Sequence, residues 1–213
     1  MITKTNITVP ALDALREKLP GMMSEKRLRH VLEVEKMAVR LGKILLPGED
    51  NEMVLRAAAL LHDVTKEYSV ADHLKVASTV GQMPTALEIS APKTLHAITA
   101  AVLIPLKYPE FAYDAVIRAV RWHTTGRADM SMEEKIVYLA DYIDESRTYP
   151  ECVRLRDEFF GAEPEKMDAD ELDRHLRRVL IDSFDVTLRG LLDDGLPVHP
   201  DTTAARNYLI MQA

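Results

Sequence analysis

Histidines and aspartates occur in this sequence with spacings that suit a metal site. The seven histidines are His30, His62, His73, His96, His123, His175 and His199. His62 is followed directly by Asp63, and the pair ends an apolar run from Ala57 to Leu61. Adjacent residues on a helix are about 100° apart, so both side chains can reach one ion at the helix rim. A carboxylate buried at the end of an apolar stretch is costly unless it is paired or bound to a metal.

Two further segments carry the same residue types. Asp141 stands in another apolar stretch, after Ile136 and Val137, and His30 stands early in the segment that begins at Ser24. Imidazole and carboxylate ligands without sulfur suit Mn, Fe, Co or Zn. Because Cys152 is the only cysteine, a thiolate zinc site and an intrachain disulfide are both excluded.

Helices are the elements that must position these residues, because the apolar spacing is helical almost throughout. Apolar residues recur at three- and four-residue steps from Ser24 to Leu46, where Pro47-Gly48 ends the helix. Asn51 is expected to cap the next helix, which leads into His62-Asp63. Further helices are predicted over 69–80, 94–107, 111–125, 131–145 (opened by a capping box of Ser131 and Glu134), 168–195 and 201–211.

The fold class that follows is all-α. No sustained period-two run of β-branched and aromatic residues indicates a strand. The 213 residues fit one domain, 1–213, with a core over about 25–160 and helices over about 168–211 packing on it. His73 and His175 are expected on polar helix faces, exposed to solvent.

The composition is that of an ordinary globular protein, 47% hydrophobic and 29% charged. With 27 Lys and Arg against 34 Asp and Glu, the net charge is −7, which argues against nucleic-acid or membrane partners. Residues 1–10 lack the pattern of a signal peptide, and no apolar run approaches the roughly 20 residues of a membrane span. We expect a cytoplasmic protein.

Six sequence blocks carry a resemblance to a known family. They are Arg27-Leu-Arg-His30, Leu60-Leu-His-Asp63-Val-Thr-Lys66, Leu95-His96, His123-Thr-Thr-Gly126-Arg127, Lys135-Ile-Val-Tyr-Leu-Ala-Asp141-Tyr-Ile and His199-Pro-Asp-Thr-Thr-Ala-Ala-Arg206-Asn207. The order His30, His62-Asp63, Asp141 resembles the ligand pattern of HD-domain metal phosphohydrolases. All six blocks together resemble the YqeK-type HD hydrolases, the symmetrical bis(5′-nucleosyl)-tetraphosphatases. The His-Thr-Thr-Gly-Arg block and the tail block are the specific ones, and the resemblance runs from about Glu25 to Leu209.

The resemblance implies an HD-domain helical bundle with a two-metal site. One ion would take His30, His62, Asp63 and Asp141, and a second would share Asp63 and add His96 and His123. Such a ligand set suits two divalent ions, with iron expected first and manganese or cobalt as alternatives. Two ions of this kind can activate water and hold the phosphate that it attacks.

The activity that the resemblance implies is hydrolysis of diadenosine tetraphosphate to two ADP, with catalytic roles for Asp63 and Lys66. A polyphosphate substrate brings several negative charges into an acidic protein, so cations are needed at the site. The residues expected to bind substrate phosphates are Arg127, Lys66, Arg27, Arg147 and Thr125.

Two other classes of function stay open. One is a broader HD nucleotidase or nucleoside-triphosphate hydrolase that needs only the first ion. The other is a non-enzymatic nucleotide-sensing module that keeps the fold and binds without turnover. The sequence has no P-loop and no Nudix helix signature, which excludes two other nucleotide-hydrolysing classes. It leaves the oligomeric state open, with a homodimer as one option.

Overall fold

The computed structural model describes residues 5–212. These residues form α-helices joined by loops and short 3-10 turns, and none of them lies in a strand, so the predicted all-α fold is confirmed. The helices are α1 (Val9–Lys18), α2 (Glu25–Leu45), α3 (Glu49–Leu61), α4 (Val70–Ser78), α5 (Ala86–Ser90), α6 (Leu95–Lys107), α7 (Asp114–Trp122), α8 (Met132–Ile143), α9 (Pro150–Gly161), α10 (Ala169–Asp193) and α11 (Pro200–Met211).

Helices α2 and α3 form an antiparallel pair that carries two of the sequence blocks. Ser24 caps α2 as the sequence predicts, since its side chain accepts a hydrogen bond from the backbone N–H of Arg27. The expectation that Asn51 caps α3 is wrong. Gly48, with φ +139°, lets the chain turn early, and α3 begins at Glu49. Asn51 is buried. Its Nδ2 donates hydrogen bonds to the carbonyl oxygens of Leu46, at the end of α2, and of Pro47, at 3.3 and 3.2 Å.

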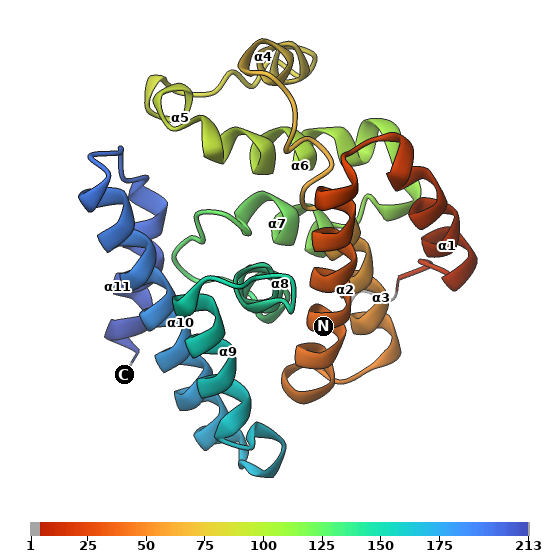
Figure 1. Cartoon of the computed structure of the whole chain (residues 1–213). Coiled ribbons are helices and arrows are strands. Elements are labelled where there is room, and N and C mark those ends of the chain that lie inside the picture. Colours follow the sequence, from red (N-terminus) through yellow and green to blue (C-terminus); the bar gives the residue numbers. More distant parts are fainter. Residues whose placement is uncertain (1–4, 213) are drawn as a thin grey trace.

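Helix α8 is the central element of the fold. It packs against α2, α3, α7, α9 and α10, and Figure 1 shows it end-on in the middle of the molecule. Its capping box forms as predicted between Ser131 and Glu134. Most of the α8 side chains are buried, with Ile136, Val137 and Leu139 fully inaccessible. A helix surrounded by other helices needs apolar residues on most of its faces, and α8 meets that need.

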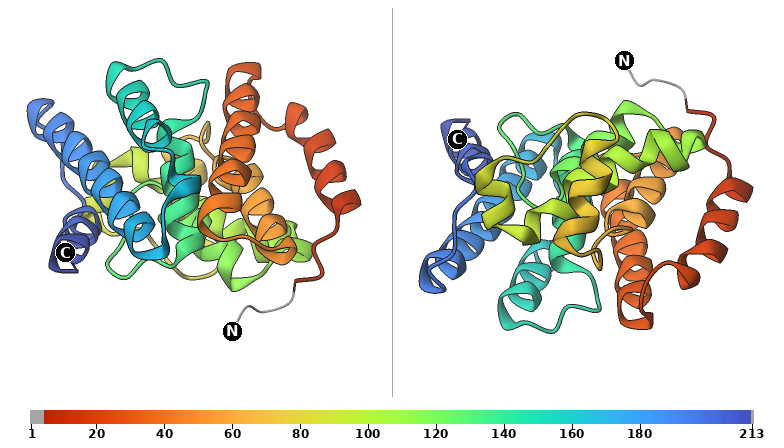
Figure 2. Two further views of the ribbon diagram at one scale, coloured as in Figure 1. Left: turned by 90° about the horizontal axis from the view of Figure 1, so that it is seen from below. Right: turned by 90° about the horizontal axis from the view of Figure 1, so that it is seen from above.

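The C-terminal helices α10 and α11 lie on one side of α8, and α1 lies on the other side beyond α2 and α3 (Figures 1 and 2). Phe184 of α10 stacks on Tyr138 of α8 with ring centroids 4.6 Å apart. Gly126 adopts φ +63°, and a Cβ atom there would lie 2.6 Å from the Phe184 ring. The loop after α7 therefore needs glycine for its backbone angle and for this close approach.

Two histidines lie in places that the sequence did not predict. His73 is buried, with Nδ1 2.8 Å from the Thr99 hydroxyl, and His175 is buried, with Nε2 3.0 Å from the Phe159 carbonyl oxygen. The expectation that both are exposed is wrong, because α6 covers the face of α4 and α9 covers the face of α10 on which they lie. No helix within residues 5–212 is long and apolar enough to cross a membrane.

Candidate metal centre

Five helices bring the six predicted ligands together. The ligands are His30 from α2, His62 and Asp63 from the end of α3, His96 from the first turn of α6, His123 from the end of α7 and Asp141 from α8. Four of these helices, α2, α3, α7 and α8, pack against one another in the middle of the molecule (Figure 1). All six residues are buried except Asp141, whose side chain is 17% exposed. Residues from separate blocks of the sequence therefore form one compact cluster in the fold.

Asp63 lies at the centre of this cluster, and its two carboxylate oxygens face different histidines. Oδ2 lies 3.6 Å from His30 Nε2 and 3.4 Å from His62 Nε2. Oδ1 lies 3.2 Å from His96 Nε2 and 3.7 Å from His123 Nε2. The cluster thus has two halves that share Asp63. We call them the His30 half (His30, His62, Asp63 Oδ2 and Asp141) and the His96 half (Asp63 Oδ1, His96 and His123).

Backbone carbonyls fix the orientation of two imidazoles. His62 Nδ1 lies 2.6 Å from the Ala59 carbonyl oxygen, and His123 Nδ1 lies 2.7 Å from that of Val120. A carbonyl oxygen can only accept a hydrogen bond, so Nδ1 carries the proton in both rings. In the neutral form of each ring, Nε2 keeps a lone pair that faces Asp63. Both histidines end their helices, where the ring reaches back to the carbonyl three residues earlier.

Asp144 lies beside the third imidazole, and the sequence did not predict this residue at the site; the Ser146 hydroxyl also lies 3.4 Å from His30 Nδ1. The Asp144 side chain is fully buried, and its Oδ2 lies 3.2 Å from His30 Nδ1. The Ser146 N–H donates to Asp144 Oδ1 at 2.8 Å, and Arg147 Nε lies 3.4 Å from Oδ2. The available signal was a carboxylate three residues after Asp141, just past the end of an apolar helix. Such a residue is buried only where it has partners.

Unpartnered polar atoms test whether the cluster fits a metal ion. Among the described residues, the buried atoms His30 Nε2, His62 Nε2 and Asp63 Oδ1 have no hydrogen-bond partner. Burying such atoms without a partner is costly, so they require another source of stabilisation. Three lone-pair donors from nitrogen and oxygen, all within 4.8 Å of the other cluster atoms, suit a divalent transition metal. The residues of the cluster therefore fit a divalent metal ion.

The carboxylates of the cluster are held in the charged form. Burial acts to raise the pKa of Asp63, but the charge of His62 and the nearby ring nitrogens of His123 and His96 hold that pKa well below its usual range. The partial burial of Asp141 likewise acts to raise its pKa, but the guanidinium of Arg147 holds that pKa well below the usual range. Both carboxylates can therefore act as ligands at neutral pH.

The histidines of the two halves differ in the direction in which their pKa values are shifted. Burial lowers the pKa of His96 to about 3 and also lowers that of His123. For His30, burial opposes protonation, but the carboxylates of Asp141 and Asp144, 2.9 and 3.2 Å from its ring nitrogens, outweigh it and raise the pKa to about 9. The His96 half therefore presents neutral rings, the form in which histidine binds a metal. A metal in the His30 half would replace the proton that the two carboxylates otherwise stabilise.

Three of the four predicted cations lie at the cluster. Lys66 Nζ lies 3.0 Å from His96 Nε2 and 3.7 Å from Asp63 Oδ1. Arg27 Nη1 pairs with Asp63 Oδ2 at 2.5 Å, and Arg147 Nη2 lies 2.7 Å from an Asp141 oxygen. Burial lowers the pKa of Lys66. Positive charge thus surrounds the two carboxylates, in the place where phosphate oxygens would approach.

The structure does not bring Arg127 to the cluster. Its Nη2 pairs with the buried Glu134 at 3.0 Å, and its Nη1 donates to the Ala128 carbonyl oxygen at 2.8 Å. The expected phosphate contact of Arg127 stays a prediction that its position does not support. Thr125 is buried, and its hydroxyl donates to the Gly126 carbonyl oxygen at 2.9 Å.

Thr124, rather than the predicted Thr125, lies at the cluster. Its hydroxyl lies 3.1 Å from Nε2 of both His96 and His123. The His-Thr-Thr block indicates that a threonine follows His123 at the site. It does not indicate which of the two threonines faces the histidines. Helix α7 ends at Trp122, so the helical angle between successive residues no longer applies there.

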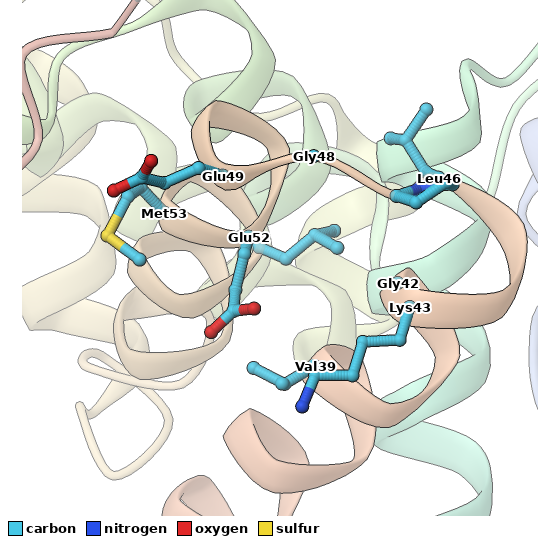
Figure 3. Close-up of a pocket in the computed structure, with 10 residues that line it drawn as sticks. Val39, Gly42, Lys43, Leu46, Gly48, Glu49, Glu52 and Met53 are labelled. Carbon is cyan, nitrogen blue, oxygen red and sulfur yellow. The ribbon is translucent and has the colours of Figure 1, made fainter.

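Two hollows open beside the cluster. One, of about 270 Å³, is lined by Lys66, His123, Asp141 and Arg147 and opens directly over it. The other, of about 340 Å³, is basic, with Lys26, Arg27, Arg29 and Arg147 in its wall. A further pocket, of about 440 Å³, lies at the opposite end of the α2–α3 pair (Figure 3). No cluster residue lines it, and it is separate from the candidate centre.

Comparison with known proteins identifies the class. The family model for the HD domain matches residues 27–146, a range that contains all six cluster residues. The chain therefore belongs to the HD-domain family, and it is a metal-dependent phosphohydrolase.

More particular relatives cover most of the chain. A protein of Halalkalibacterium halodurans named symmetrical bis(5′-nucleosyl)-tetraphosphatase is 30% identical over 89% of this chain and 92% of its own. A Bacillus subtilis protein of the same name is 29% identical over 88% of this chain and 91% of its own. The crystal structure of an HD-superfamily hydrolase from Clostridium acetobutylicum, described as involved in NAD metabolism, matches with a TM-score of 0.80. It is 31% identical and covers 94% of this chain and 97% of its own.

Proposed function

We propose that this protein hydrolyses dinucleoside tetraphosphates symmetrically, so that diadenosine tetraphosphate gives two ADP. The names of the relatives, which match nearly the whole chain, support this substrate class. The observation that carries the proposal is the central position of Asp63, whose two oxygens face separate sets of histidines. Such an arrangement suits two ions that share one carboxylate.

The proposed centre holds two divalent ions. We assign four ligands of the His30 half to one ion and three ligands of the His96 half to the other; His30, His62 and Asp63 lie within 4.8 Å of one another, as do Asp63, His96 and His123. Nitrogen and oxygen donors without sulfur favour iron in our proposal, with manganese or cobalt as alternatives. When bound, two such ions lower the pKa of water and polarise the phosphate oxygens.

The residues around the ions neutralise and position the substrate. Lys66 and Arg147 line the hollow over the cluster, where they can pair with phosphate oxygens, and Arg27 lines the basic hollow and pairs with Asp63. Symmetrical hydrolysis breaks the anhydride bond between the second and third phosphates, and the water oxygen bonds to one of the two phosphorus atoms. The nucleoside diphosphate that leaves is already a weak base. Charge neutralisation by Lys66 and the arginines is therefore needed more than a proton donor.

The remaining proposals concern the whole chain. We propose a single domain, because one connected core of buried residues extends from Ile7 to Leu209. We also propose that the partner is the nucleotide substrate, with no nucleic acid or membrane, and that the protein is cytoplasmic. The net charge of −7 and the absence of a spanning helix within residues 5–212 support this.

The test is product identification with anaerobically purified, metal-analysed protein. Diadenosine tetraphosphate should give ADP alone, whereas AMP plus ATP would contradict the proposal. His62→Ala and Asp63→Ala should lose both turnover and bound metal while the helical signal remains. His175→Gln provides the matched control, since His175 is equally buried but lies outside the cluster. Full activity in either cluster variant would refute the assignment.

A further inference from the structure

A third hollow lies on the other side of the cluster from the basic one. It has a volume of about 280 Å³, close to the roughly 300 Å³ at which small-ligand pockets begin. One wall is the turn after α5, with Ala91 and Pro92, and the other is the end of α10 and the following loop, with Leu191, Leu196 and Pro197. Most of the surface that lines this hollow is apolar, although Ser90, Lys93 and Thr94 also belong to the first wall. We call this hollow the apolar pocket.

The apolar pocket adjoins the hollow over the cluster. Thr124 and Thr187 line both of them. The Thr124 hydroxyl also lies 3.1 Å from Nε2 of His96 and of His123, so a single side chain separates the pocket from the His96 half. A ligand whose body fills the pocket can therefore extend one end directly over the candidate ions.

Charge is distributed unequally along this row of hollows. Lys93 is the only lysine or arginine in the wall of the apolar pocket. The basic hollow on the far side of the cluster has Lys26, Arg27, Arg29 and Arg147. A polyphosphate is favoured at the basic end and over the cluster, whereas the apolar end offers it almost no compensation for lost hydration.

The tail block of the sequence closes the apolar pocket. His199 and Thr202, at the start of α11, are part of its lining. His199 Nε2 lies 3.7 Å from a carboxylate oxygen of Glu88, and Arg121 Nη2 lies 3.4 Å from the same oxygen. Because Glu88 belongs to α5, these contacts hold the two walls of the pocket together across more than a hundred residues of sequence.

We propose that the apolar pocket binds one nucleoside of the substrate. In this orientation the phosphates run from the pocket across the cluster, and the second half of the substrate extends toward the basic hollow. The inference rests on the proposed function, since it assumes a substrate with both a nucleoside and several phosphates. A flat base with an adjoining ribose fits the pocket chemistry, in which apolar walls are combined with threonine hydroxyls near the cluster.

Two leucine substitutions provide a matched test in the metal-loaded protein. Leu196→Trp fills the apolar pocket from a residue that is 40% exposed, which limits its effect on folding. Leu46→Trp is the control, because Leu46 lies in the loop after α2 and lines the separate pocket of Figure 3. Steady-state kinetics with diadenosine tetraphosphate are measured for each, together with the inhibition constants of ADP and of inorganic tripolyphosphate.

We expect Leu196→Trp to raise the KM for diadenosine tetraphosphate and the inhibition constant of ADP, each by about tenfold or more. Inhibition by tripolyphosphate, which has no nucleoside, should stay within about twofold of the unsubstituted protein. Leu46→Trp should change none of the three. An unchanged KM and ADP inhibition in Leu196→Trp, or an equal loss for ADP and tripolyphosphate, would overturn the proposal.

A second variant protects the test against a folding defect. Ala91→Leu fills the same pocket from the opposite wall, and the same selective loss of ADP inhibition is expected. If both variants keep their melting temperature and their ADP inhibition, the pocket does not bind the nucleoside. Failure of the proposed function would look different, because the unsubstituted protein would then not convert diadenosine tetraphosphate to ADP at all.

Discussion

Replacement of His123 by alanine is the sharpest test of a two-ion centre. Our assignment places His123 in the His96 half, where its Nε2 lies 3.7 Å from Asp63 Oδ1, although the same ring also lies within reach of His62 and Asp141. Without it, that half keeps two protein ligands, fewer than the three that catalytic metal sites commonly use. The His30 half keeps all four of its ligands. We therefore expect metal content to fall from about two ions per chain to about one.

The expected effect on the rate is large and that on the fold is small. Loss of one preorganised electrostatic contact to the reacting phosphate typically costs about 10²–10³ in kcat, and we expect His123→Ala to lose at least about 100-fold. Removal of the His123 ring also leaves the Val120 carbonyl oxygen without its hydrogen-bond donor, which lowers the free energy of unfolding by about 1 kcal/mol. For a chain of this length that corresponds to a melting temperature about 2–4 °C lower.

The assay combines metal analysis, turnover and thermal melting on one anaerobic preparation. Asp63→Ala is the companion variant, since its two oxygens serve both halves, and it should lose both ions. If His123→Ala retains two ions and normal turnover, the reasoning fails. His123 would then only end α7 through its bond to Val120, and the protein would be a mononuclear HD phosphohydrolase.

Three further predictions follow from the same contacts. Complete chelation should lower the melting temperature by about 5–10 °C for each ion that was present at about 100 times its dissociation constant, and an unchanged melting curve after verified removal would argue against a tightly bound native centre. Asp144→Asn should weaken metal binding by about 10- to 100-fold through loss of His30 orientation, as measured by chelator competition, and Ser146→Ala should have a smaller effect. Arg127→Ala should cost about 1–3 kcal/mol in urea unfolding because buried Glu134 loses a partner, with kcat/KM unchanged; a selective fall in kcat/KM would instead support phosphate binding by Arg127.

His30, His62-Asp63 and Asp141 could be proposed from the sequence itself, whereas His96 and His123 were expected as ligands only through the family resemblance. His62-Asp63 ends an apolar run, and Asp141 interrupts another, so burial of both carboxylates followed from their neighbours alone. What local pattern cannot specify is the direction of a side chain once a helix has ended. Thr124 and Thr125 follow the end of α7, and the cluster contact belongs to Thr124 rather than to Thr125.

Proline made the missed helices hard to detect. The sequence analysis did not identify α1, α5 or α9, and both α1 and α9 have a proline in the first turn. Proline ends a helix when it lies in the interior, but in the first turn its missing N–H has no partner to lose. Pro10 and Pro150 therefore mark the beginning of helices. Helix α5 has only five residues, too few to show a periodic pattern.

Arg127 illustrates why charge in a sequence block does not by itself locate a phosphate site. The sequence predicts the capping box of Glu134 correctly, since that interaction is local and uses one carboxylate oxygen for the backbone of Ser131. A buried carboxylate still needs compensation for its charge. Arg118 and Arg127 supply it at 2.8 and 3.0 Å, and both come from outside the helix that Glu134 opens.

The tail block extends this argument to the proposed nucleoside pocket. Its residues read locally as a helix start, and His199 does cap α11 by accepting a hydrogen bond from the Asp201 N–H. The same imidazole also lies 3.7 Å from Glu88, which brings the tail against the turn after α5. Two walls that no local pattern connects thus enclose a pocket beside Thr124. If that pocket binds a nucleoside, the tail block contributes to substrate selection as well as to the helix it opens, and filling the pocket should impair ADP binding while leaving metal content at about two ions per chain.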